Sequence, residues 1–197
     1  MAERYDYTHA EQKERILKIC LSVSIWVVSV VAVIAFAWLV IKLTVLKTTV
    51  VDASMEPTLM EGDSVIIDTF TYRIRSPKRN EVIVFQQGDS EHCFYNIKRV
   101  IGLPGEKLRI SEGIVYINGE PLTEFANVDT VILPGLANYE ITLGEDEYFV
   151  LGDSRNNSED SRYATIGNVK KSDIIGRAWI RTNKFGFINS LNKKSDE

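Results

Sequence analysis

Three short segments carry side chains that could together do chemistry. Ser54 lies in the segment SMEPTL, Lys98 in KRVIGLPGE and Ser158 in the polar run GDSRNNSEDSR. A serine hydroxyl is a poor nucleophile until a base takes its proton, and a lysine can be that base while its amine is neutral. Taken one at a time, the three segments read more simply as a turn serine, an exposed strand lysine and a surface loop. Taken together, they suggest a nucleophile, a base and a hydroxyl that orients the base.

A lysine base needs an environment that lowers its pKa. Free lysine has a pKa near 10.4, and lowering it by about three units takes roughly 4 kcal/mol, which burial away from water can supply. Lys98 lies among Ile97, Val100 and Ile101, in a run that predicts a strand. Strand alternation places Lys98 on the face opposite to Ile97 and Arg99. This apolar strand is therefore a plausible place for a neutral amine.

The element nearest the N-terminus is an uninterrupted apolar run. From Ile19 to Ile41 the sequence has no charge, proline or glycine. As a helix, these roughly 23 residues would extend about 34 Å, enough to cross a hydrocarbon core of about 30 Å. A cleavable signal sequence would have a shorter apolar core followed by a small-residue site. A buried core helix is the other alternative, but a domain this small could hardly cover every face of it. We therefore expect an uncleaved membrane anchor.

Basic residues are distributed unevenly around this span. Those that precede it are Arg4, Lys13, Arg15 and Lys18, and those that follow it closely are Lys42 and Lys47. Because basic residues are retained on the cytoplasmic side, this bias predicts a cytoplasmic N-terminus with the bulk of the chain outside.

The remainder of the chain reads as β structure. Short runs rich in Val, Ile, Tyr and Phe, such as residues 81–85 and 94–101, alternate with turn signals such as Asn118-Gly119. This pattern predicts a mainly β fold, an antiparallel β domain with tight connections. The stretch of about residues 106–146 is less apolar and predicts a small β insertion within it.

Composition disfavours several other classes of function. The cysteines Cys20 and Cys93 and the histidines His9 and His92 are widely spread or lack partners at zinc-binding spacing. We therefore expect no disulfide, no metal and no cofactor. A net charge of −4 also argues against nucleic acid as a partner, because phosphate binding needs a concentrated basic surface.

In this order behind an N-terminal anchor, SMEPTL, KRVIGLPGE and GDSRNNSEDSR resemble the motifs of bacterial type I signal peptidases, or leader peptidases, a serine–lysine dyad family. The single span and compact insertion resemble the shorter form typical of Gram-positive bacteria. The resemblance extends from the anchor to about Ala178.

The resemblance implies a role for each matching residue. Ser54 matches the nucleophile, Lys98 the general base and Ser158 the serine that hydrogen-bonds the lysine, while Asp160 and Arg162 match the pair that braces the loop. The implied activity is that of a membrane-bound serine endopeptidase. It would remove N-terminal signal peptides from exported preproteins through an acyl-enzyme, cutting after small residues at the first and third positions before the cut.

The same resemblance implies an organisation for the chain. Residues 1–18 would be a cytoplasmic tail, 19–41 the transmembrane anchor, 48–181 an extracytoplasmic peptidase domain in the cell membrane, and 182–197 a C-terminal tail. The implied partners are the signal peptides of secreted preproteins and the lipid bilayer.

Two positions depart from the family pattern near the site. Asp52 stands where some members have a serine whose hydroxyl completes the oxyanion hole, and a carboxylate cannot donate that hydrogen bond. Asn96 stands two residues before the lysine, where the family often has an aromatic or β-branched side chain. We expect Met55, Ile66 and Asn96 to line the substrate pocket.

Three alternatives are weaker. Self-cleaving repressors also use serine and lysine, but they need a DNA-binding helix-turn-helix and no membrane span. Eukaryotic-type signal peptidases have a histidine where Lys98 stands. A non-catalytic membrane-tethered chaperone or pilus-assembly factor on the same fold typically loses the serine or the lysine, and this chain has both.

Overall fold

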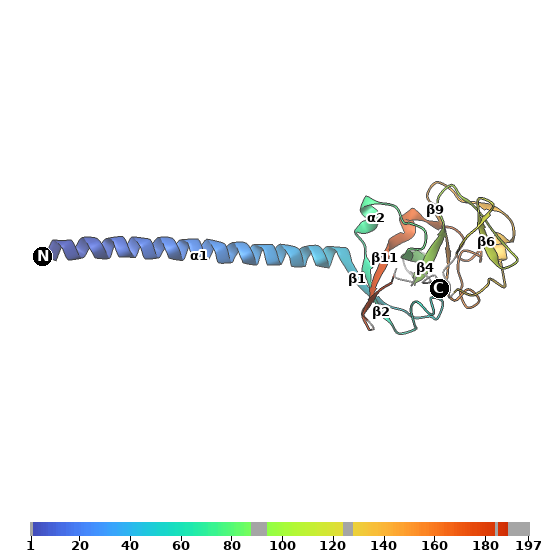
Figure 1. Ribbon diagram of the computed structural model, residues 1–197, viewed down its shortest axis with the longest axis horizontal. Helices are drawn as coiled ribbons and strands as arrows, with labels where there is room; N and C mark the ends of the chain where they lie inside the picture. The colour runs from blue at the N-terminus through green and yellow to red at the C-terminus, as the bar shows by residue number, and fades with distance from the viewer. Residues whose placement is uncertain (1, 88–93, 124–127, 184, 189–197) are drawn as a thin grey trace, which may run out of the picture. The chain divides into compact units, whose positions relative to one another are not determined.

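The computed structural model describes residues 2–87, 94–123, 128–183 and 185–188. The chain divides into two compact units, Met1–Thr44 and Val45–Glu197 (Figure 1). Predictions for His92 and Cys93 lie outside the described residues.

The first unit is a single helix, α1 (Ala2–Thr44). Its stretch Gln12–Val40, with a mean hydropathy of 2.7 and none of its window buried, is the one helix in the described part of the chain that is long and apolar enough to cross a membrane. Within it, the hydroxyls of Ser24 and Ser29 donate to the carbonyl oxygens of Cys20 and Ile25, each at 2.8 Å. These two hydroxyls are thus satisfied inside the helix, as a lipid environment requires.

The second unit is built on an antiparallel sheet of eight strands. Its order is β1 (Val45–Thr49), β2 (Ser64–Asp68), β11 (Ile174–Arg181), β3 (Val82–Gln87), β4 (Phe94–Gly102), β9 (Glu147–Leu151) and β10 (Val169–Lys170), with β12 (Gly186–Phe187) paired to β11. The short helices are α2 (Thr71–Ile74), η1 (Gly135–Asn138) and η2 (Lys171–Asp173). The predicted mainly antiparallel β fold behind one apolar helix is confirmed.

A second, smaller antiparallel sheet is formed within the segment where the sequence predicts an insertion. Its order is β7 (Glu120–Pro121), β6 (Ile114–Ile117), β5 (Lys107–Ser111) and β8 (Ile141–Thr142), and Figure 1 shows it, marked by β6, beyond β9. The turn between β6 and β7 is the predicted Asn-Gly hairpin. Asn118 and Gly119 have φ values of 53° and 86°, as a tight two-residue turn requires.

The large sheet is covered on both faces near β3 and β4. Val82 and Val84 belong to a core cluster with Met55 and Ile97, whereas Ile83 belongs to a second cluster with other residues of the sheet. All of these side chains are buried, so residues 82–85 of β3 have no solvent face and form a continuous apolar run. Residues 97–100 of the adjacent β4 are likewise buried on both faces, including the charged Lys98 and Arg99.

Candidate active site

The central contact of the site joins Lys98 to Ser54. Lys98 lies on β4 opposite Ile83 of β3, and it is 1% exposed. Its Nζ donates a hydrogen bond to Ser54 Oγ at 2.6 Å. The two residues are separated by 44 positions in the chain, so the fold brings the predicted nucleophile and base into direct contact.

The segment that carries Ser54 is held by the hydrophobic core and by the loop after β9. Met55 and Leu59 are completely buried in the core, and the amide of Leu59 donates to the carbonyl of Met55 at 2.9 Å. The amide of Ser154, in the loop after β9, donates to the carbonyl of Ser54 at 3.0 Å. Apolar burial and a backbone bond together set the position of the serine hydroxyl.

The surroundings of Lys98 favour its neutral form. Burial lowers the pKa of Lys98, while the negative charges of Asp52, Asp160 and Glu159 act in the opposite direction, and the result is a lowered pKa. This is the direction that a lysine base requires.

Ser158 lies beside this pair without the bond that the resemblance implies. It is buried, and its Oγ has no hydrogen-bond partner in the structure, so the expected bond to Lys98 is absent here. A methyl group placed on Gly152 would lie 2.5 Å from Ser158 Cβ and 2.6 Å from the carbonyl oxygen of Ser54. Gly152 is thus the point where the loop and the Ser54 segment meet, and an unpartnered buried hydroxyl stands next to that contact.

Asp160 and Arg162 form a buried, two-armed ion pair. Arg162 Nε and Nη2 each lie 2.8 Å from a different oxygen of Asp160. Asp160 also accepts from the amide of Gly152 at 3.1 Å, and Arg162 donates to the carbonyls of Arg155 at 2.5 Å and Leu133 at 3.1 Å. The pair therefore holds the loop from Gly152 to Arg162 in one conformation.

A second buried ion pair was not predicted. Arg99 Nε and Nη2 lie 2.6 and 2.5 Å from the two carboxylate oxygens of Asp153. Thr58 donates to the same carboxylate at 2.5 Å, and Arg99 also donates to the carbonyl of Asn80 at 2.7 Å. This network links the Ser54 segment, β4 and the loop after β9. The sequence signal for this pair was the adjacency of Lys98 and Arg99, which places the two charges on opposite faces of one strand. Where a strand is covered on both faces, both charges must be buried.

Asp52 is the other polar group at the site. Its Oδ1 accepts from the amide of Ser54 at 3.0 Å and from the hydroxyl of Ser54 at 2.6 Å. Its Oδ2 lies 3.8 Å from Lys98 Nζ. Burial on its own would raise the pKa of Asp52, but the bonds from Ser54 and the charge of Lys98 outweigh it and the pKa is lowered.

The predicted pocket residues differ in burial and in their neighbours. Met55 is completely buried, whereas Ile66 is half-buried and pairs with Lys47 and Ile180 in the sheet. Asn96 is half-buried and donates to Gln87 at 2.8 Å. The substrate pocket stays a prediction.

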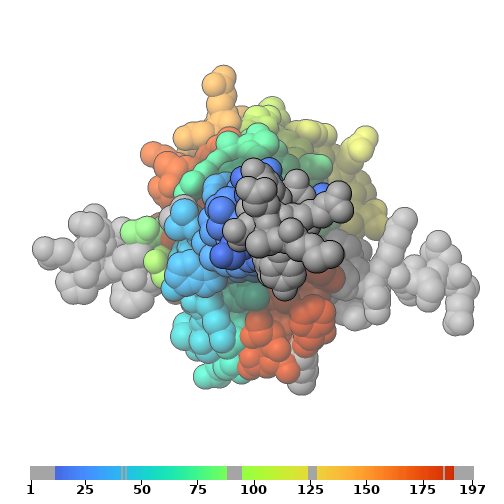
Figure 2. Space-filling view, turned by 90° about the vertical axis from the view of Figure 1, so that its left-hand side faces the viewer, coloured from blue at the N-terminus to red at the C-terminus, as the bar shows by residue number. Residues whose placement is uncertain are grey.

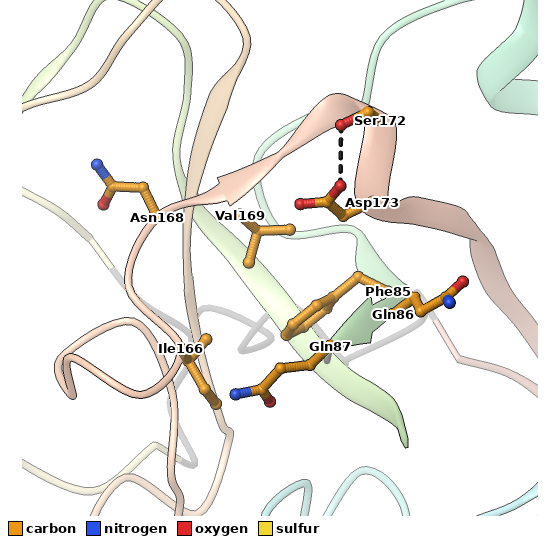
Figure 3. A pocket seen from close by; sticks show the side chains of 8 residues that line it. All are labelled: Phe85, Gln86, Gln87, Ile166, Asn168, Val169, Ser172 and Asp173. Atoms are coloured by element: carbon orange, nitrogen blue, oxygen red, sulfur yellow. Dashed lines mark hydrogen bonds between the residues drawn. The ribbon is translucent and has the colours of Figure 1, made fainter. Parts of the chain in front are cut away.

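A pocket of about 390 Å³ lies elsewhere on the sheet. It lies between the end of β3, at Phe85, Gln86 and Gln87, and residues 166–173, which include β10 and η2 (Figure 3). None of the predicted site residues lines it. Within the described ranges, no group of three or more histidine, cysteine or acidic side chains could hold a metal ion.

Gly152 offers a local test of this geometry. We predict that Gly152→Ala lowers the reactivity of Ser54 as a nucleophile by about 100-fold, because the added methyl group must push apart the loop and the Ser54 segment by a fraction of an ångström or more. Gly144→Ala is the matched control, since its methyl group meets side-chain atoms of Glu147, none closer than 3.3 Å. Assays of both variants, with thermal unfolding to confirm folding, check this. Full activity of Gly152→Ala would show that the close approach is not needed.

Known proteins resemble the chain over most of its length. Residues 23–182 match the profile of the family described as signal peptidase, peptidase S26. A probable signal peptidase I-2 of Synechocystis sp. is 42% identical over 134 residues, which cover 66% of this chain and 59% of that protein. Signal peptidase I of Bacillus amyloliquefaciens is 31% identical over 170 residues, which cover 83% of this chain and 86% of that protein.

The share of each relative that the chain covers varies. The chain spans 64% of the signal peptidase I of Leptolyngbya laminosa, so it covers less than two thirds of this relative and of the Synechocystis protein. A crystal structure of a signal peptidase I from Enterococcus faecalis is 31% identical, with a TM-score of 0.40, and the match covers 53% of this chain and 97% of that one. Since the family profile matches well over half of the residues, the chain belongs to the S26 signal peptidase family.

Proposed function

We propose that this chain is a membrane-bound serine endopeptidase that removes N-terminal signal peptides from exported preproteins. The observation that carries the proposal is the 2.6 Å hydrogen bond between the buried Lys98 amine and the Ser54 hydroxyl. Membership of the S26 family supports the same reaction. A non-catalytic chaperone or pilus-assembly factor would have no need for this contact, so the enzyme is favoured.

The proposed reaction has two chemical stages. Neutral Lys98 takes the Ser54 proton while Ser54 Oγ attacks the scissile carbonyl carbon. The lysine then gives that proton to the departing amine, and the signal peptide remains as an ester on Ser54. Water activated by Lys98 hydrolyses this ester and restores the serine. The backbone amide of Ser54 is the donor that would stabilise the negative oxygen in both stages.

The proposed substrate is an extended segment with small side chains near the cut. Backbone hydrogen bonds to a strand edge would give affinity, and shallow pockets would exclude large side chains. Met55, Ile66 and Asn96 are the proposed pocket walls. Unchanged cleavage-site choice after substitution of all three would exclude them.

The proposed location is the outer face of the cell membrane. α1 would be the anchor, with residues 1–18 in the cytoplasm, residues 48–181 outside as the peptidase domain and 182–197 as its tail. The excess of basic residues before the span supports this orientation.

An exposed aromatic cluster supports contact between the second unit and lipid. Phe187 lies near Trp179 and Phe185, with ring centroids 6.2 and 6.4 Å apart, and Phe185 is 81% exposed. In Figure 2 the red-orange end of the described chain, which includes β12, lies on the surface. Aromatic rings on a surface favour the interface between water and lipid.

The direct test uses the full chain in lipid vesicles with a purified preprotein. We expect one new N-terminus after a small residue, read by mass spectrometry, and no cut in a preprotein with tryptophan at that position.

The orientation is tested separately in spheroplasts. Protease added outside them should digest the second unit and leave α1. Failure to process any signal peptide would contradict the function, and protection of the second unit would contradict the orientation.

A further inference from the structure

The carboxylate of Asp52 accepts hydrogen bonds from both the amide and the hydroxyl of the nucleophile Ser54. Oδ1 accepts from the amide of Ser54 at 3.0 Å and from its hydroxyl at 2.6 Å. The Asp52 side chain is 55% exposed, while that of Lys98 is 2% exposed. Asp52 therefore lies on the solvent side of the pair and can move without disturbing the core.

The position of Oδ1 conflicts with the transition state of the proposed reaction. Acyl transfer places a negative oxygen on the substrate carbonyl, and the amide of the nucleophilic serine is a common donor to it. In this structure a carboxylate oxygen already accepts from that amide. Two negatively charged oxygens cannot share one N–H, so the substrate oxygen must replace Asp52.

The direction of the hydrogen bonds is also that of a resting site. Lys98 Nζ donates to Ser54 Oγ, and Ser54 Oγ in turn donates to Asp52. A lysine base must instead accept the serine proton. The bond between Lys98 and Ser54 reverses only when the hydroxyl leaves Asp52.

Of the acidic groups that act on Lys98, Asp52 is the one whose described contacts are with the catalytic pair itself. Across the sheet, the register partner of Lys98 on β3 is the apolar Ile83. From the loop after β9, Asp160 and Glu159 act on Lys98, but Asp160 is paired with Arg162 and Glu159 accepts from Thr165. The described partners of Asp52 are Ser54 and Lys98 themselves.

We propose that Asp52 is a positioning residue that holds the free enzyme in a resting state, and that the scissile carbonyl of the bound peptide displaces it to start the reaction. This inference rests on the proposed peptidase function. In the free enzyme the carboxylate accepts from both the amide and the hydroxyl of Ser54 and lies 3.8 Å from the lysine amine. In the complex it swings into solvent, the serine amide turns to the substrate, and the amine becomes free to accept the proton.

The proposal makes a signed prediction for the pH profile. Below the pKa of Lys98 the amine is protonated and cannot act as a base, so kcat/KM falls as the pH is lowered through this pKa. The charge of Asp52 raises the pKa of Lys98. Removing that charge in Asp52→Asn should move the acidic limb of kcat/KM to lower pH by about one unit, which is a gain of up to about tenfold on that limb.

The experiment compares the full-length wild type, Asp52→Asn and Asp52→Ala in detergent micelles. The substrate is a peptide whose side chains do not titrate over the range studied. Both variants should shift the limb in the same direction, and a substrate-like peptide aldehyde, which adds to the serine, should bind them faster than it binds the wild type. Asp68→Asn is the matched control, because Asp68 accepts from Thr71 and Phe70 instead, and its profile should equal that of the wild type.

The outcomes separate the two proposals. The resting-state role is overturned if the wild type cleaves the peptide but both Asp52 variants have its acidic limb and its rate of association with the aldehyde. An equal loss of activity at every pH would also overturn it, because it would mean that Asp52 only supports the fold. A wild type without any cleavage activity would instead contradict the proposed function.

Discussion

Replacing Ser54 by alanine or Lys98 by methionine should lower kcat/KM for signal-peptide cleavage by at least about 10³-fold, as removal of a nucleophile or base does in other serine hydrolases. Ser54→Ala removes the atom that forms the ester. Lys98→Met keeps the length and apolar stem of the side chain but removes the amine, which lies 2.6 Å from the hydroxyl. The two losses should not add in the double variant, because both residues serve one step.

Residues of the same types on the small sheet provide controls. Ser111→Ala and Lys107→Met change a serine and a lysine on β5, away from the site, and should retain wild-type rates. Preprotein processing is followed on gels, and thermal unfolding confirms that each variant is folded. If Lys98→Met cleaved at more than a tenth of the wild-type rate, another group would have to be the base.

The largest expected effect on stability is at the buried pair of Arg99 and Asp153. Asp153→Leu leaves the guanidinium of Arg99 buried without its carboxylate, which should cost about 3–5 kcal/mol. For a unit of this size, that loss corresponds to a drop of roughly 10 °C in the midpoint of thermal unfolding. Activity should fall too, because the same carboxylate accepts from Thr58, in the segment that carries the nucleophile.

A double variant distinguishes an unpaired charge from a loss of packing. Arg99→Met together with Asp153→Leu removes both charges of this pair and should recover at least half of the lost stability. Lys107→Met is the control, since its ion pair with Glu140 is more than half exposed on both sides and should contribute at most about 1 kcal/mol. A double variant no more stable than Asp153→Leu would contradict this account of the pair.

The sequence was most informative where one local pattern had one physical meaning. The uncharged run of residues 19–41 can satisfy its backbone in lipid only as a helix, and α1 contains it. Turn signals such as Asn118-Gly119 predicted antiparallel hairpins, because the backbone conformation they favour is rare elsewhere. These features depend on neighbouring residues alone and need no knowledge of the tertiary structure.

Features that depend on long-range contacts were harder to predict. Arg99 and Asp153 are separated by 54 positions, and nothing in either segment alone specifies that they pair. The orientation of Ser158 depends on a close approach to Gly152, and the contacts of Asp52 depend on the path of the backbone around Ser54. Motif resemblance indicated which residues gather at the site, but it did not indicate which hydrogen bonds they form there.

The most direct test of the central claim is to locate the covalent intermediate. The full chain would be mixed with a signal-peptide ester that acylates the enzyme faster than the acyl-enzyme is hydrolysed. The reaction would be quenched in acid and the protein digested. Mass spectrometry would then identify the acylated peptide. We predict that the acyl group is found on Ser54 in the wild type and is absent in Lys98→Met under the same conditions. An acyl group on another residue, or equally rapid acylation of Ser54 in Lys98→Met, would contradict the proposal that Lys98 activates Ser54.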